Sequence, residues 1–447
     1  MRIGTSPARL VAVRGRFVTI AATLSVALAI GTPIALQLRA SHRARTLSAR
    51  AIDLLEVGPG SLGPEMLPDT GAALRLAVRA RAIDPELGAA RYALHLGTGI
   101  RDLARHDLFL AEGELGAASS DRPGAAAPRR YLGMALLEAG RLGEARVAFD
   151  AALSRDSHDV HALVGLGDVE LERGDHEAAL PRYEAALELE PRLASVHDRV
   201  GLALARSGRL EEAERALRRG VALDGRLPEP RVSLGNLLLR QGRIDEAEAA
   251  YRGALSVSGT NATAHLDLGI LLFESGRSAE AERHLARAAE LDLDDPTARG
   301  ALGDLYAASG SLPSAIASYN EAIERDPASP ALQNNLGNAL ERAGRLDDAE
   351  RAFRRAIELD PVLAFPHNGL GSVLLARGDG PGAIAELERA VSLAPDVPHA
   401  YFNLGLALTR VGRGDAARTA FDRACELGTA AACGVTSTSR GTTRGRR

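Results

Sequence analysis

Histidine and cysteine are the residues of this 447-residue chain whose chemistry would suit metal binding or nucleophilic catalysis. His197, His265 and His367 share one position of an internal repeat, because multiples of 34 residues separate them. Such a row could hold a ligand, but the three histidines fall in repeats that are not neighbours. His158 and His161 lie close in sequence without an acidic or cysteine partner at metal-ligand spacing. We therefore interpret the histidines as ordinary surface or interhelix residues and predict no metal site.

The motifs of the common catalytic sites are also missing from the sequence. All 54 basic residues are arginine, so no lysine can act as a Schiff base, a general base or a phosphate ligand. There is no P-loop, no HExxH motif and no nucleophile elbow. Paired acids such as Glu211-Glu212 and Asp347-Asp348 lie where helices are expected to begin, and there they compensate the helix dipole. We predict that the chain is not an enzyme and that it binds no cofactor.

A 34-residue repeat organises most of the chain. A Leu-Gly pair, replaced once by Val200-Gly201, recurs nine times from Leu132-Gly133 to Leu404-Gly405. A second glycine follows seven residues after the first glycine, an alanine follows at twelve and a bulky apolar residue at sixteen. Nine repeats in register, without an insertion, indicate a stack of similar units rather than one globular core.

The spacing within each repeat predicts two antiparallel helices. The first glycine and the alanine are small because two backbones must pass closely, and the second glycine supplies the left-handed residue that ends the first helix. The bulky residue and the alanine one turn later form an apolar stripe that only a neighbouring repeat can cover. We expect an all-α, right-handed α-solenoid with nine repeats over residues 126–431, preceded by two divergent repeats over residues 54–125.

This pattern closely resembles the tetratricopeptide repeat (TPR) family, whose 34-residue consensus places leucine, glycine, alanine, an aromatic residue and proline at these spacings. The consensus tryptophan is replaced here, most often by histidine or arginine. The resemblance implies that the first helix of each repeat lines a concave face, which receives a peptide or another protein. No nucleic acid and no small-molecule substrate is expected.

Asparagines at the concave-face positions suggest what such a groove would bind. The run NNLGNAL at residues 334–340 resembles the TPR arrays of the O-linked N-acetylglucosamine transferase type, which use asparagine to grip peptide backbone. An amide both donates and accepts, so it can pair with any extended backbone. The ladder is interrupted at Gly300, Leu266 and Val232, and a merely polar helix surface is the alternative interpretation. The residues that the resemblance assigns to the groove are Asn334, Asn338, Arg342, Asn368, Phe402 and Arg410.

The basic residues of the chain bear on two further features of TPR proteins. Arg342 and Arg410 share their position near the end of the first helix with Arg206 and Arg240, where arginine suits the helix dipole whatever the partner. The family's clamp for a C-terminal carboxylate requires lysine, which this chain lacks. We therefore do not predict that specificity.

The two cysteines, Cys425 and Cys433, end the last repeat. The segment RACELGTAAAC resembles the Sel1-like relatives of TPRs, in which such a pair joins the end of one helix to the start of the next. The resemblance implies a disulfide if this part of the chain lies outside the cytoplasm. Two unrelated thiols are the alternative for a cytoplasmic location.

The N-terminus contains a long uncharged segment. Residues 17–38 carry no charge, and about 20 apolar residues suffice for a helix to span a bilayer. We expect an uncleaved anchor here, between a basic segment at residues 1–16 and a juxtamembrane segment at residues 39–53; a cleaved signal peptide is the alternative. Arginines on both sides make the orientation nearly undetermined. A single-pass membrane protein with an extracytoplasmic body is slightly favoured.

The net charge of −4 conceals a segregation of charge along the chain. Residues 1–50 have eight arginines and no acid, and residues 431–447 have four arginines and no acid. The repeat region between them is therefore strongly acidic, which argues against nucleic-acid binding. Residues 432–447, without periodicity, are expected to form a flexible basic tail.

The predicted function follows from a repeat array without a catalytic constellation. We expect a non-catalytic, membrane-tethered scaffold that binds a protein or peptide on its concave face and helps to assemble a membrane or envelope complex. The competing hypothesis is a regulatory or substrate-binding subunit of a glycosyltransferase-like enzyme whose catalytic part is another chain.

Overall fold

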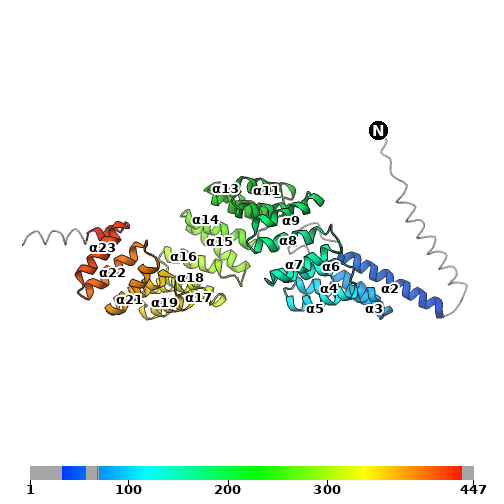
Figure 1. Ribbon diagram of the computed structural model, residues 1–447, viewed down its shortest axis with the longest axis horizontal. Helices are drawn as coiled ribbons and strands as arrows, with labels where there is room; N and C mark the ends of the chain where they lie inside the picture. The colour runs from blue at the N-terminus through cyan, green and yellow to red at the C-terminus, as the bar shows by residue number, and fades with distance from the viewer. Residues whose placement is uncertain (1–32, 57–67, 69, 435–447) are drawn as a thin grey trace, which may run out of the picture. The chain divides into compact units, whose positions relative to one another are not determined.

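The computed structural model describes residues 33–56, 68 and 70–434 of the chain (Figure 1). These residues form 22 α-helices and no strand, and they divide into two compact units that meet at residues 241 and 242. The helices of the first unit are α2 (Pro33–Glu56), α3 (Thr70–Ile83), α4 (Gly88–Leu103), α5 (Leu108–Asp121), α6 (Ala127–Glu138), α7 (Leu142–Leu153), α8 (Val160–Glu172), α9 (His176–Leu189), α10 (Ala194–Arg206), α11 (Leu210–Leu223) and α12 (Glu229–Arg240). Those of the second unit are α13 (Ile244–Val257), α14 (Ala262–Glu274), α15 (Ser278–Leu291), α16 (Thr297–Ala308), α17 (Leu312–Arg325), α18 (Pro330–Arg342), α19 (Leu346–Leu359), α20 (Ala364–Ala376), α21 (Gly380–Leu393), α22 (Pro398–Arg410) and α23 (Gly414–Glu426).

Within each unit, an even-numbered helix pairs with the odd-numbered helix that follows it, as in α4 with α5 and α18 with α19. Successive even-numbered helices also pack against one another within a unit, as α6 does on α8 and α18 on α20. The even-numbered helices therefore form a continuous face in each unit, which we call the even-helix face. An all-α solenoid of helical hairpins, as the repeat predicts, is confirmed.

The first glycine of the repeat has the role that its spacing predicts. A Cβ atom added to Gly337 would lie 2.6 Å from the ring of Phe353, the bulky residue sixteen positions on, and one added to Gly167 would lie 2.4 Å from Tyr183. No side chain fits at such distances, so the two helices of a hairpin can cross closely only at glycine. The second glycine ends the first helix in the left-handed region, for example at φ 75° in Gly344.

In α7, α11, α13, α15 and α19, an acid in the first turn bonds to the arginine that precedes the helix. Glu212 accepts from Arg209 at 2.7 Å, and Asp348 from Arg345 at 2.6 Å. Arg277 additionally reaches Glu248 of the preceding odd-numbered helix at 2.8 Å. These acids therefore bridge loops and neighbouring repeats, besides compensating the helix dipole.

The N-terminal part of the chain departs from the predicted boundaries. Helix α2 runs from Pro33 to Glu56, so residues 33–38 of the predicted anchor and the whole predicted juxtamembrane segment belong to one helix. It packs on α3 and α4 with Ala44, Ala51 and Leu55 fully buried. The first hairpin therefore begins well before residue 54, because the apolar positions of α2 continue the core of the repeats.

Within the described part of the chain, no helix is both long and apolar enough to cross a membrane. The remainder of the predicted anchor or signal segment, residues 17–32, lies outside that part, as do the basic segment at residues 1–16 and the tail from residue 435. Residues 430–434 form a short helical turn, so the segment without periodicity begins slightly later than expected.

Candidate functional site

Three of the six predicted groove residues occupy equivalent turns of three neighbouring helices. Asn334 lies on α18, Asn368 on α20 and Phe402 on α22, and each of these helices packs on the next. All three side chains are partly exposed. The register of the repeat thus places them in one row along the even-helix face of the second unit.

The other three predicted residues lie further along two of the same helices. Asn338 is exposed in the middle of α18, and Arg342 and Arg410 are exposed in the last turns of α18 and α22. The structure therefore gives the row of Asn334, Asn368 and Phe402 a polar and cationic flank.

Amide side chains along this face bond to neighbouring amides and to Asp304. Asn403 donates to the Oδ1 atom of Asn368 at 3.0 Å, Asn335 donates to Asp304 at 3.2 Å, and Asn334 donates to Asn335 at 3.3 Å. The Oδ1 atom of Asn334 is buried without a hydrogen-bond partner. Turning the Asn334 amide toward a ligand would therefore break only one long hydrogen bond.

One side of the Phe402 ring packs against the protein core. Its ring meets that of Phe421 edge to face, with centroids 5.7 Å apart. This packing fixes the ring while leaving part of it exposed, which suits an apolar anchor point for a bound chain.

Charged side chains at some equivalent positions of the first unit form ion pairs within the protein. Arg130 on α6 donates to Asp159 at 3.0 Å, and both side chains are almost fully buried. Asp168 on α8 accepts from the Tyr183 hydroxyl at 2.8 Å and pairs with Arg199 at 3.1 Å. Here the even-helix face is held together by ion pairs between neighbouring helices.

Burial shifts the titration of two groups near these pairs. Burial raises the pKa of the Asp198 carboxyl to about 6, against the opposing effect of Ser233 and Arg199. Burial, together with the positive charge of Arg130, lowers the pKa of His161 to about 4. Both groups have a buried polar atom without a hydrogen-bond partner, Oδ1 in Asp198 and Nδ1 in His161. Hydrogen bonds within the protein therefore only partly replace the water that Asp198 and His161 lose on burial.

The three histidines in register share a structural contact. The Nε2 atoms of His197, His265 and His367 each lie 3.3 Å from the backbone carbonyl oxygen six residues earlier, in the turn that precedes the helix. Arg231 makes the same kind of contact to Gly225 at 2.9 Å. The position of the family tryptophan is thus used here to satisfy turn carbonyls. The shared donor chemistry of histidine and arginine was the sequence signal for this role.

No group of three or more histidine, cysteine or acidic side chains in the described ranges is arranged to hold a metal ion. His265 and His284 approach each other, with their Nδ1 atoms 2.9 Å apart, but no third ligand joins them. Burial lowers the pKa of both imidazoles.

The two cysteines lie together at the end of the second unit. The structure joins Cys425 and Cys433 in a disulfide with Cα atoms 4.9 Å apart, a separation typical of such bonds. Ala432, which directly precedes Cys433 in the short helical turn, is fully buried in the core formed with α23. The pair thus connects this turn to the last helix.

Comparison with known proteins supports the repeat assignment. The family model for the cilia and flagella-associated protein 70 C-terminal domain matches residues 89–329, more than half of the chain, and a tetratricopeptide repeat model matches residues 301–364 and 368–432. Repeat scaffolds of these families are typically non-catalytic, and TPR proteins bind protein or peptide partners.

A curated relative and several solved structures are also similar to this chain. Cellulose synthase operon protein C of Komagataeibacter xylinus is 38% identical over 72 residues, which span 16% of this chain and only 6% of that protein. The Cut9–Hcn1 structure of the APC/C is 14% identical, covering 76% of this chain and 93% of that chain with a TM-score of 0.43. Yeast Tom70 is 13% identical, covering 90% and 96% with a TM-score of 0.41. No argument rests on the two solved structures.

Two family models, the glycine contacts within the hairpins and the stacking of even-numbered helices agree on one assignment. The protein is a TPR scaffold that mediates protein–protein interactions, and the chain belongs to the tetratricopeptide repeat family described by the C-terminal domain of cilia and flagella-associated protein 70.

Proposed function

We propose that the even-helix face of the second unit binds an extended peptide segment of a partner protein. The observation that carries this proposal is the row formed by Asn334, Asn368 and Phe402 on three helices that pack in succession. An extended peptide presents alternating N–H and C=O groups, and asparagine amides can pair with both. Phe402 would receive an apolar side chain, and Arg342 and Arg410 would receive carboxylates.

The test is recovery of partners by the full-length protein, solubilised from membranes. We expect the Asn334→Ala/Asn338→Ala/Asn368→Ala variant to lose most of the recovered partner. Arg206→Ala is the matched control, since Arg206 is exposed at the corresponding position of Arg342 in the first unit. Unchanged recovery with the triple variant would remove the site assignment.

We further propose that residues 17–38 tether the protein to a membrane and that the repeat units lie outside the cytoplasm, where they assist in assembling an envelope complex. The support is the uncharged stretch of 22 residues flanked by arginine. Protease treatment of intact cells, and of cells with a permeabilised outer membrane, distinguishes the possible locations. Digestion of the repeat units only after lysis of the inner membrane would contradict an extracytoplasmic location.

An extracytoplasmic location carries a consequence for Cys425 and Cys433. We expect these cysteines to be bonded in the protein isolated from its host, because oxidising compartments preserve disulfides. Alkylation before and after reduction, followed by mass spectrometry, counts the bonded thiols. Complete alkylation without reduction would show that the pair is reduced.

A second candidate is a regulatory or substrate-binding subunit of a glycosyltransferase-like enzyme. It is favoured by the 72-residue similarity to a protein whose name refers to a cellulose synthase operon. Cross-linking of the protein to a glycosyltransferase chain would favour this candidate, and cross-linking only to other envelope proteins would favour the scaffold.

A further inference from the structure

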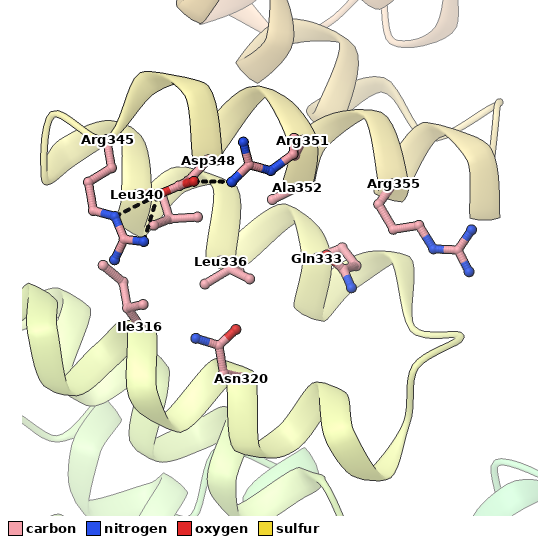
Figure 2. Close-up of a pocket in the computed structure, with 10 residues that line it drawn as sticks. All are labelled: Ile316, Asn320, Gln333, Leu336, Leu340, Arg345, Asp348, Arg351, Ala352 and Arg355. Carbon is pink, nitrogen blue, oxygen red and sulfur yellow. Dashed lines mark hydrogen bonds and ion pairs between the residues drawn. The ribbon is translucent and has the colours of Figure 1, made fainter.

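A pocket opens between α17 and α19 in the second unit, with α18 beneath it (Figure 2). Its volume is about 350 Å³, at the lower end of the range of roughly 300–1,000 Å³ for ligand pockets. Ile316 from α17, Leu336 and Leu340 from α18 and Ala352 from α19 supply apolar, largely buried lining. The pocket thus offers a small hydrophobic floor on the side of the repeats where the odd-numbered helices lie.

The rim of this pocket is cationic. Arg345, Arg351 and Arg355 project along α19, and Asp348 is the one carboxylate among the lining residues. Arg345 and Arg351 both bond to Asp348, as the dashed lines of Figure 2 show, so two guanidinium groups share a single carboxylate. Arg355 reaches Glu358 at 3.1 Å, outside the lining. The lining therefore carries more positive than negative charge.

The pocket exists because side chains that fill the neighbouring grooves are absent here. One repeat later, the positions of Gln333 and Ala352 are occupied by His367 and Glu386, which pair at 2.7 Å across the groove. At the α17–α19 groove, alanine replaces the acid and cannot bridge to glutamine.

The groove one repeat earlier is filled in another way. Arg299, at the position of Gln333, is buried and donates to the backbone of Ala289 at 3.0 Å. Tyr306, at the position of Leu340, donates its hydroxyl to Glu282 at 2.7 Å. The α17–α19 groove has neither side chain, so its floor stays open while its rim keeps three arginines.

We infer that this pocket binds an acidic peptide segment of another protein, with an aliphatic side chain on the floor and carboxylates on the arginine rim. Incoming carboxylates would take over guanidinium donors that now share Asp348, through charge-assisted hydrogen bonds. Asn320 and Gln333 line the same pocket and can pair with peptide backbone, which a simple anion would not use. This site is independent of the even-helix face.

The test uses the full-length protein and a short fluorescein-labelled peptide of alternating leucine and glutamate, with binding followed by fluorescence anisotropy. A peptide with glutamine in place of glutamate is the ligand control. We expect the acidic peptide to bind, the glutamine peptide to bind at least about tenfold more weakly, and added salt to weaken the acidic peptide selectively.

Two variants locate the binding. Gln333→His/Ala352→Glu recreates the pair that closes the next groove and should weaken binding about tenfold or more. Arg351→Glu/Arg355→Glu changes only exposed side chains, so it tests the site even if the first variant folds poorly. Arg389→Glu, at the position of Arg355 in the next repeat, is the matched control and should bind as the unaltered protein does. Circular dichroism checks the helical content of each variant.

Three results would overturn the inference. The first is an absence of binding by the acidic peptide. The second is undiminished binding by the two pocket variants. The third is an equal loss in Arg389→Glu, which would show general attraction to arginine rather than a pocket.

Discussion

The even-helix faces of the two units place different chemistry at the same repeat positions. At one repeat position the first unit has Arg130, Val164, Asp198 and Val232, and the second unit has Leu266, Gly300, Asn334, Asn368 and Phe402. Arg130 is buried in an ion pair with Asp159, whereas the two asparagines are partly exposed. Asn334 donates to Asn335 at 3.3 Å, and Asn368 accepts from Asn403 at 3.0 Å. The backbone register is common to both faces, so the difference lies in the side chains alone.

This difference separates two uses of one scaffold. Removing one partner of a buried ion pair strongly destabilises the folded protein, because the other charge stays buried without a partner. Neutral amides near the surface can change partners at small cost, since water or a ligand replaces the lost bond. Arg130 in the first unit is therefore tied to the fold, whereas Asn334 and Asn368 in the second unit can exchange their hydrogen bonds at small cost.

The largest effect is expected from breaking the buried pair. Arg130→Met should destabilise the first unit by about 3–5 kcal/mol, because Asp159 would remain buried without its partner. Asn334→Ala should cost about 1 kcal/mol or less. Urea unfolding followed by circular dichroism measures both. Equal losses would mean that the two faces do not differ in the way proposed.

Asp198 provides a pH-dependent contrast. Its carboxyl has a pKa of about 6 in the folded protein, above its ordinary value of 3.8, so the ionised form is penalised by folding. The penalty is fully present above pH 6 and disappears as pH falls toward 4. Asp198→Asn should therefore stabilise the protein by roughly 2–3 kcal/mol at pH 7.5 and by little near pH 4.

The difference in stability between Asp198→Asn and the unaltered protein should be measured across this pH range. His161 has a lowered pKa, so the folded protein loses stability as pH falls from 6.5 to 4. This contribution is the same in both proteins and cancels in the difference. A difference that is independent of pH would contradict the assigned burial of the Asp198 charge.

Replacing the first glycine of the repeat tests the close helix crossing that both units share. Gly167→Ala in the first unit and Gly337→Ala in the second should each cost about 1–3 kcal/mol, since each new methyl group would meet an aromatic ring of its own hairpin. Thermal unfolding monitored by circular dichroism compares them. A large loss in only one unit would show that the scaffolds differ as well as the faces.

Features that recur every 34 residues could be read from the sequence. The glycine before each close crossing, the left-handed glycine and the hairpin architecture all follow from spacing, because each repeat restates the same constraint. The row of Asn334, Asn368 and Phe402 followed from the same register.

Features that depend on single side chains could not be read in this way. The start of α2 at Pro33 lacks the repeat signature. The bond between Arg130 of α6 and Asp159, the N-cap of α8, joins two residues that no motif links. The pocket beside Ala352 results from a missing partner for Gln333. The sequence shows that Gln333 and Ala352 stand where the next repeat has His367 and Glu386. Only the structure shows that these two positions face each other.

The central claim is that partners contact the even-helix face of the second unit rather than that of the first. A photo-crosslinking amino acid placed at position 342 or at position 206 tests it directly, since both arginines are exposed at the same repeat position. In the native host, we expect a specific protein adduct from position 342 and none from position 206. Adducts from position 206 alone, or equal adducts from both positions, would contradict the claim.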